Sequence, residues 1–258
     1  MKHTIYFILA AIAFSSCQEV IDLELGAVDA QLVIQGNIYD KPGPYYVTLA
    51  TTVDFDEPGE YPPVSGATVI ISDNHGVVDT LTEKDPGTYE TSEITGISGY
   101  TYDLTVIIDG SAYYTATSTM PEAVAVDSVY FGEAFFGNEE LLTISFRDTE
   151  GINNYYRLIE FINGELQTDI HVISDELYDG EKIEYPIMSM GNDNGFKTGD
   201  SISIRLLCID EGVYDYFRTA GGDMAQSASP ANPVSNISNG ALGYFNASAV
   251  SSKSVVVQ

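Results

Sequence analysis

The sequence is poor in several residue types on which protein function often depends. Its 258 residues include no tryptophan, two cysteines, three histidines and only ten lysines and arginines, against 38 acidic residues. The formal net charge of -28 repels phosphate backbones, so nucleic acid is excluded as a partner. This negative charge could concentrate cations such as Ca²⁺ or basic peptides, but we favour the simpler interpretation that a solvated acidic surface maintains solubility. The absence of tryptophan counts against a sugar-stacking platform.

The two cysteines do not form a disulfide framework. Cys208 lies inside the apolar run Ile204–Ile209, and the only other cysteine is Cys17, close to the N-terminus. Without a partner, Cys208 is predicted to be a buried small hydrophobe in a strand and not a nucleophile.

Long hydrophobic runs are also scarce. Residues 5–14 are apolar, follow the basic Lys2 and lead into Ser15-Ser16-Cys17. Ten residues span roughly 15 Å as a helix, about half of a hydrocarbon core, so residues 1–16 predict a signal peptide and not a membrane span. The small residues before Cys17 indicate a lipoprotein acylated on that cysteine, with residues 17–30 as a tether. The alternative is an ordinary secretory signal with an incidental cysteine.

The residues after Cys17 bear on where the anchor lies. The residue after Cys17 is Gln18 and not Asp. An Asp at this position would resemble an inner-membrane retention signal, so Gln18 favours the outer membrane. Glu19 and Asp22 resemble the surface-export signal of Bacteroidota lipoproteins. We therefore expect a lipid-anchored outer-membrane protein that is exposed at the cell surface.

The rest of the chain predicts a mainly β fold. Short strands separated by Gly, Pro and Asn turns predict an immunoglobulin-like or transthyretin-like β-sandwich over residues 31–120. After the hinge Pro121-Glu122-Ala123, residues 124–258 predict a second β-rich domain. Its expected features are a hairpin turn at Asn163-Gly164, a helix at 211–220 that Asp210 caps, and the closing strands Gly243–Ala247 and Val255–Val257.

Several segments carry a family resemblance. The patterns at 64–69, 87–89, 99–106 and 110–113 resemble carboxypeptidase-regulatory-like and transthyretin-like sandwiches. The whole chain after the signal resembles an uncharacterised family of Bacteroidota outer-membrane lipoproteins found beside TonB-dependent receptors. The landmarks of that resemblance are Cys17 with Ile21-Asp22-Leu23, Met120-Pro121, Asp127-Ser128-Val129, Phe146-Arg147-Asp148, Tyr155-Tyr156-Arg157, Asp175–Gly180 and Asn236–Phe245. The resemblance implies a location and a neighbourhood, and it transfers no catalytic residue.

The residues themselves predict no enzyme. An active site needs a nucleophile with a base, paired carboxylates or a metal cluster. His75 lies in a turn, and His171 has no nucleophile motif beside it, so neither is expected to be catalytic. The acidic stretches 54–57 and 193–195 could offer oxygen ligands to Ca²⁺, but they lack the spacing of a calcium loop. No catalytic residue, cofactor or metal site is therefore assigned.

The expected function is recognition. Aromatic residues in turn-rich segments are candidate partner contacts, namely Phe55, Tyr61, Phe135 and Phe136. The alternative is that these side chains fold back and cap the core. We expect a non-enzymatic accessory to a TonB-dependent receptor β-barrel in ligand capture or uptake. A structural or adhesive surface module is the first alternative, and a hydrolase is the second.

Overall fold

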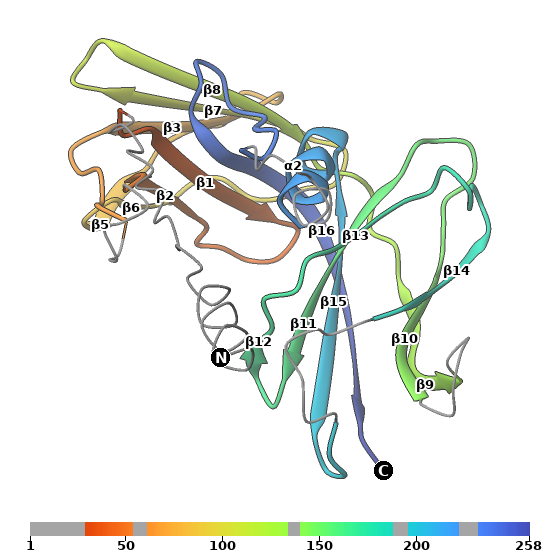
Figure 1. The fold of residues 1–258 in the computed structure, drawn as a ribbon. Coiled ribbons are helices and arrows are strands. Elements are labelled where there is room, and N and C mark those ends of the chain that lie inside the picture. The colour runs from red at the N-terminus through yellow and green to blue at the C-terminus, as the bar shows by residue number, and fades with distance from the viewer. Residues whose placement is uncertain (1–28, 54–60, 134–139, 188–195, 222–231) are drawn as a thin grey trace, which may run out of the picture.

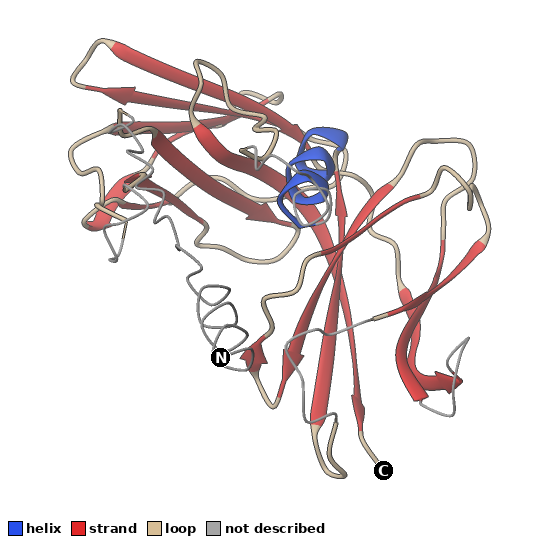
Figure 2. Ribbon diagram, viewed as in Figure 1, coloured by secondary structure: helices blue, strands red, loops and turns tan. Residues whose placement is uncertain are grey.

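The computed structural model describes residues 29–53, 61–133, 140–187, 196–221 and 232–258 (Figure 1). Within these ranges the chain forms sixteen strands and one helix, which confirms the predicted mainly β class (Figure 2). The elements, in chain order, are β1 (Leu32–Tyr39), β2 (Tyr46–Thr51), β3 (Thr68–Asp73), β4 (Val78–Thr80), β5 (Thr82–Asp85), β6 (Thr88–Glu90), β7 (Thr101–Ile108), β8 (Ala112–Thr119), β9 (Val126–Glu133), β10 (Glu140–Arg147), β11 (Tyr155–Ile162), β12 (Glu165–Leu166), β13 (His171–Ser174), β14 (Lys182–Pro186), β15 (Ser201–Ile209), α2 (Glu211–Gly221) and β16 (Leu242–Val256).

Strands from both ends of the chain build the largest sheet. Its nine strands run β12-β11-β15-β16-β1-β2-β6-β5, with β13 also paired to β11. The sheet β4-β3-β7-β8 lies across its N-terminal strands as the second layer of a sandwich, and the sheet β14-β10-β9 flanks its other end (Figure 1). Alternating residues of all three sheets, such as Ile34, Leu104 and Ile144, are almost fully buried in one hydrophobic core.

The closing strand β16 joins the two halves of the molecule. Residues 242–248 pair in parallel with β1, and residues 249–256 pair antiparallel with β15. The prediction of two separate closing strands is therefore wrong, because a single strand runs from Leu242 to Val256. Its middle is buried on both faces and carries Ala, Ser and Asn, so it lacks the alternation that marks a strand. The domain boundary near Pro121 stays a prediction. The strand β16 pairs with β1 of the first predicted domain and with β15 of the second.

Gly243 permits the parallel pairing. It has a φ of 95°, and a Cβ placed there would lie 1.9 Å from the carbonyl oxygen of Ile34. Any side chain at this position would therefore push β16 away from β1.

The predicted helix and hairpin are confirmed. Asp210 caps α2, since its Oδ1 accepts the N–H of Val213 at 2.9 Å. Its other oxygen accepts the hydroxyl of Ser118 and, at 3.1 Å, the N–H of Thr119, so the cap also fastens α2 to β8. Asn163 and Gly164, with φ of 52° and 88°, make the turn between β11 and β12.

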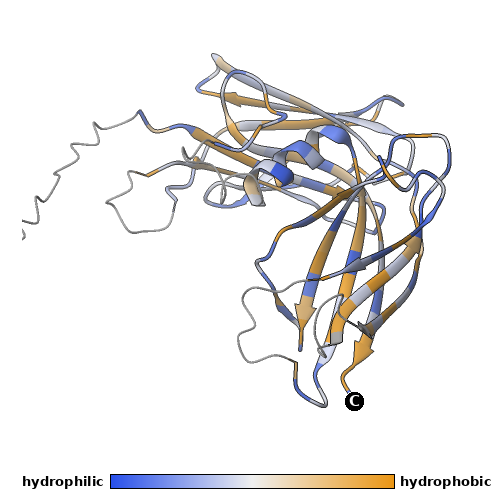
Figure 3. Cartoon of the chain, turned by 45° about the vertical axis from the view of Figure 1, so that its right-hand side comes forward, coloured by the Kyte–Doolittle hydropathy of each residue, from blue (hydrophilic) through white to orange (hydrophobic). Residues whose placement is uncertain are grey.

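The helix covers one face of the large sheet. Val213 and Phe217 of α2 are buried against Leu207 and Ile209 of β15, on the face opposite the main core. Figure 3 shows the corresponding alternation of hydrophobic and hydrophilic residues along the strands. We refer to the face under α2 as the outer face and to the opposite one as the inner face.

Candidate functional site

Of the four predicted contact residues, one lies within the described part of the chain. Phe55, Phe135 and Phe136 fall outside the described residues, as does the predicted acylation site Cys17, so these predictions stay open. Tyr61 is described, and 64% of its surface is exposed.

Tyr61 borders a hollow on the outer face, which we call the Tyr61 hollow. This cavity of about 460 Å³ lies over β1, β2 and the start of β16. Gln35 and Thr48 line its floor, and Tyr216 of α2 lines the cavity as well. The alternative prediction was that Tyr61 folds back to cap the core. Tyr61 does not do so, because most of its surface is exposed to solvent.

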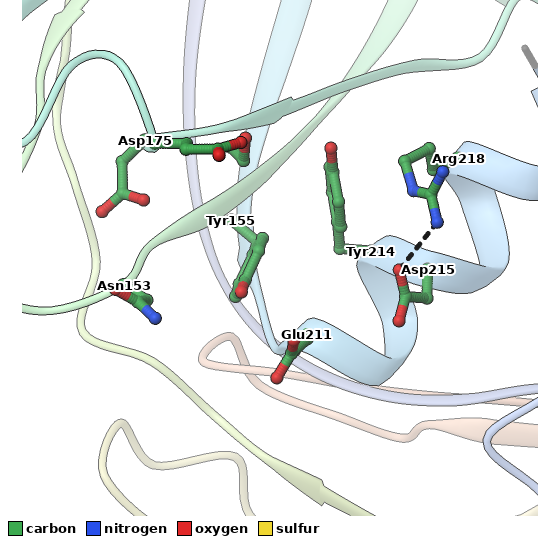
Figure 4. Close-up of a pocket in the computed structure, with 9 residues that line it drawn as sticks. Asn153, Tyr155, Asp175, Glu211, Tyr214, Asp215 and Arg218 are labelled. Atoms are coloured by element: carbon green, nitrogen blue, oxygen red, sulfur yellow. Dashed lines mark hydrogen bonds and ion pairs between the residues drawn. The ribbon is translucent and has the colours of Figure 1, made fainter.

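A second cavity, the Tyr155 hollow, has a volume of about 500 Å³ (Figure 4). It lies where β11, the end of β13 and the first two turns of α2 meet. The residues that line it are Asn153, Tyr155, Ser174, Asp175, Glu176, Glu211, Tyr214, Asp215 and Arg218. Both hollows fall within the size range of roughly 300–1,000 Å³ that is usual for small-ligand sites.

Two tyrosines form the aromatic part of the Tyr155 hollow. The ring centroids of Tyr155 and Tyr214 lie 4.9 Å apart, with an interplanar angle of 34°. Burial raises the pKa of Tyr155, and the carboxylates of Glu211 and Asp175 raise it further. The phenol therefore lies in a region of negative potential.

The polar groups of this hollow are held in place by neighbouring bonds. Asp175 is 6% exposed, and its Oδ2 accepts the N–H of Asn154 at 2.7 Å. On the helix, Arg218 lies 3.3 Å from Asp215 (Figure 4). The walls thus combine a rigid carboxylate from β13 with side chains from α2.

An aromatic cluster surrounds the half-buried Arg157 beneath α2. The Cζ atom of Arg157 lies 3.6 Å from the ring centroid of Phe217, as in a cation–π contact. Tyr244 packs against both Phe217 and Tyr216, with centroids 4.8 and 4.9 Å apart. Burial lowers the pKa of Arg157, while Tyr244 and Tyr39 favour its charged form. This cluster fixes the helix that borders both cavities.

Three acidic residues gather beside the Tyr155 hollow. Asp148, Asp175 and Asp179 each present an oxygen within 4.8 Å of the others, and such hard ligands could hold a divalent cation. Each carboxylate also accepts a local hydrogen bond: Asp148 from the hydroxyl of Tyr156 and from the Gly180 N–H at 2.8 Å, and Asp179 from the Gly151 N–H at 2.6 Å. These hydrogen bonds explain why the three carboxylates lie together, since they connect neighbouring loops. The acidic stretches 54–57 and 193–195 lie outside the described residues.

The same hydrogen bonds bring together landmarks from separate segments of the sequence. Asp148, the Tyr155-Tyr156-Arg157 triplet and the segment 175–180 all belong to the family resemblance, and the structure joins them in one network. The landmark Asn236 bonds both the N–H and the carbonyl oxygen of Phe245, at 3.0 and 2.8 Å. These landmark side chains thus fasten loops to the strands of the large sheet.

Among the described residues, His75, His171 and Cys208 do not line either hollow. His75 stacks on Tyr100 with a centroid distance of 3.7 Å in the β3–β4 turn. His171 is 7% exposed, packs edge-on against Tyr185, and burial lowers its pKa. Cys208 is a buried free thiol, as predicted, and burial raises its pKa to about 11.

Sequence reasoning missed the Tyr155 hollow, although one signal was available. Glu211, Tyr214, Asp215 and Arg218 recur at intervals of three and four residues, so they share one stripe of the helix beside the buried Val213. A polar face is ordinary for a surface helix, so the spacing predicts which side chains lie together and not that they bind a ligand. The strand residues opposite it could not be found without the fold.

Comparison with known proteins places the chain in a family. No curated protein matches it. A family model does match, and it supports the part of the predicted resemblance that concerns an uncharacterised family. That model, described as a domain of unknown function (DUF4249), matches residues 18–254, and the chain therefore belongs to this family.

Proposed function

We propose that this protein is a lipid-anchored, non-enzymatic accessory of a TonB-dependent receptor, and that it captures a ligand at the mouth of the receptor barrel in the outer membrane. The observation that carries the proposal is the pair of ligand-sized hollows beside α2, one of which includes the exposed Tyr61.

The N-terminal sequence supports the anchor. Ser15-Ser16-Cys17 follows an apolar segment too short to span a bilayer, and each buried acyl methylene would contribute about 0.8 kcal/mol of membrane affinity. In the part of the chain that the structure describes, no helix has the length and apolar character to cross a membrane. A tethered module meets a membrane partner at high effective concentration, so a weak interface is sufficient.

The make-up of the hollows supports binding. Their walls hold tyrosines, carboxylates and amides on strands and one fixed helix, as in recognition sites.

Affinity purification from mildly solubilised outer membranes tests the proposal. The wild-type protein should recover a large β-barrel receptor, and Tyr61→Ser should reduce that recovery because it removes an exposed contact. Tyr113→Ser is the matched control, since Tyr113 is also exposed (52%) but lies on β8, in the other layer of the sandwich. Failure to recover any barrel would contradict the receptor role and favour the structural or adhesive alternative.

The anchor has its own test. Cys17→Ala should abolish palmitate labelling and release the protein from membranes. A variant that stays labelled and membrane-bound would show that Cys17 is not the acylated residue.

A further inference from the structure

We infer that the Tyr155 hollow binds an organic cation, a small molecule with one or two aliphatic ammonium groups. This inference rests on the proposed function and names the class of ligand that the protein would capture.

The charges around the hollow favour a cation. Four carboxylate side chains line it, from Asp175, Glu176, Glu211 and Asp215, against the single guanidinium of Arg218. Arg218 already pairs with Asp215. The excess of negative charge repels carboxylates and phosphates and attracts ammonium groups, and the net charge of the whole chain acts in the same direction.

The aromatic pair supplies what an acidic surface alone does not. Tyr155 and Tyr214 lie side by side at the cavity, where their ring faces can accept a cation and their edges can cover an alkyl stem. The carboxylates that raise the pKa of Tyr155 lie within reach of the same ring. An ammonium group in the hollow would therefore contact both π-electrons and carboxylate oxygens.

Preorganisation adds to the attraction. The Asp175 carboxylate is held by the Asn154 N–H, and the first turn of α2, which carries Glu211, is fixed by the Asp210 cap. Groups that are already ordered lose little conformational entropy when a ligand binds.

Calorimetry on the full-length protein in mild detergent tests the inference with 1,4-diaminobutane at low salt. The neutral isostere 1,4-butanediol and the dianion succinate are the control ligands. We expect the diamine to bind, the diol to bind at least about fivefold more weakly, and succinate not to bind. Raising the ionic strength from about 0.02 M to about 0.5 M should weaken the diamine further, because salt screens exposed charges.

Variants locate the site. Glu211→Gln and Tyr214→Leu should each weaken diamine binding about threefold to fivefold. Glu165→Gln removes the same charge from exposed β12 and should leave the affinity unchanged. Urea denaturation of each variant shows that it remains folded.

Three results would overturn the inference: no diamine binding, equal binding of the diol, or equal loss with Glu165→Gln and Glu211→Gln. Equal loss in the two Gln variants would show that the negative charge of the whole surface, and not the hollow, attracts the diamine. These experiments use no receptor, so a recovered receptor without amine binding overturns this inference alone. Amine binding without a receptor supports the inference and contradicts only the transport role.

Discussion

The two faces of the nine-stranded sheet are built from the same strands and have opposite characters. On the inner face Ile34, Ile38 and Phe245 are fully buried in the main core. On the outer face, Gln35 lines the Tyr61 hollow. Tyr244, on the same face, belongs to the aromatic cluster beneath α2. The comparison teaches that strand alternation places the main core on one face and polar and aromatic groups on the other, and recognition by the second face is our proposal.

Substitutions at two adjacent residues of β16, one on each face, test this comparison with the largest expected change in the free energy of unfolding. Phe245→Ala should lower the free energy of unfolding by about 3–5 kcal/mol, because it leaves a cavity in the main core. Tyr244→Ala should cost about 1–2 kcal/mol, since Tyr244 is only partly buried and packs on Phe217 and Tyr216. Urea denaturation measures both, and equal losses would show that the faces do not differ in stability.

The cap of α2 should have the next largest effect. Asp210→Ala removes acceptors for Ser118, Thr119 and Val213, and we expect a loss of about 2 kcal/mol. Asp210→Asn keeps a capping oxygen and should lose less. The variants should also weaken binding in the Tyr155 hollow, because Glu211 follows the cap. Unchanged stability in Asp210→Ala would contradict the role of the cap.

The pH dependence of stability should have opposite signs for Asp79 and Asp210. Asp79 of β4 is 1% exposed; burial pushes its pKa up, but hydrogen bonds from the N–H groups of Glu93, Ile94 and Ser92 outweigh burial and hold it below the ordinary value. Its contribution is therefore present above about pH 4 and is lost as the pH falls toward the folded pKa, at about 1.4 kcal/mol per pH unit in that window.

Asp210 should behave in the opposite way. Burial raises its pKa, against the hydrogen bonds from Ser118 and Val213, so stability should fall as the pH rises from the unfolded pKa to the folded one. Urea midpoints at several pH values measure both effects. Asp79→Asn should flatten the acid limb, and Asp210→Asn should remove the fall above it. An acid limb in Asp79→Asn as steep as in the wild type would contradict the assignment.

The sequence predicted those features that depend on neighbouring residues. The helix at 211–220, its Asp210 cap and the Asn163-Gly164 turn follow from local chemistry, and the structure confirms them. The long strand β16 did not follow, because its buried middle carries small and polar residues whose environment comes from strands on both sides.

The candidate site depends on contacts between distant segments. The Tyr155 hollow joins Tyr155, Asp175 and Glu211, which come from β11, the end of β13 and α2. No local pattern shows that these three meet, since β11, β13 and β15 become neighbours only through sheet pairing. The exposure of Tyr61 could be anticipated, because an aromatic residue between prolines and acids is already a local signal, and its role as a partner contact stays a prediction.

Photo-crosslinking in intact cells tests most directly the claim that the outer face meets a receptor. A benzophenone amino acid replaces Tyr61 in one variant and the similarly exposed Tyr113, on the other layer of the sandwich, in a second. Both substitutions should change the free energy of unfolding by less than about 0.5 kcal/mol, because each side chain is more than half exposed. The account predicts a crosslink from position 61 to a TonB-dependent receptor barrel and none from position 113. A crosslink to the barrel from position 113 alone, or from neither position, would contradict it.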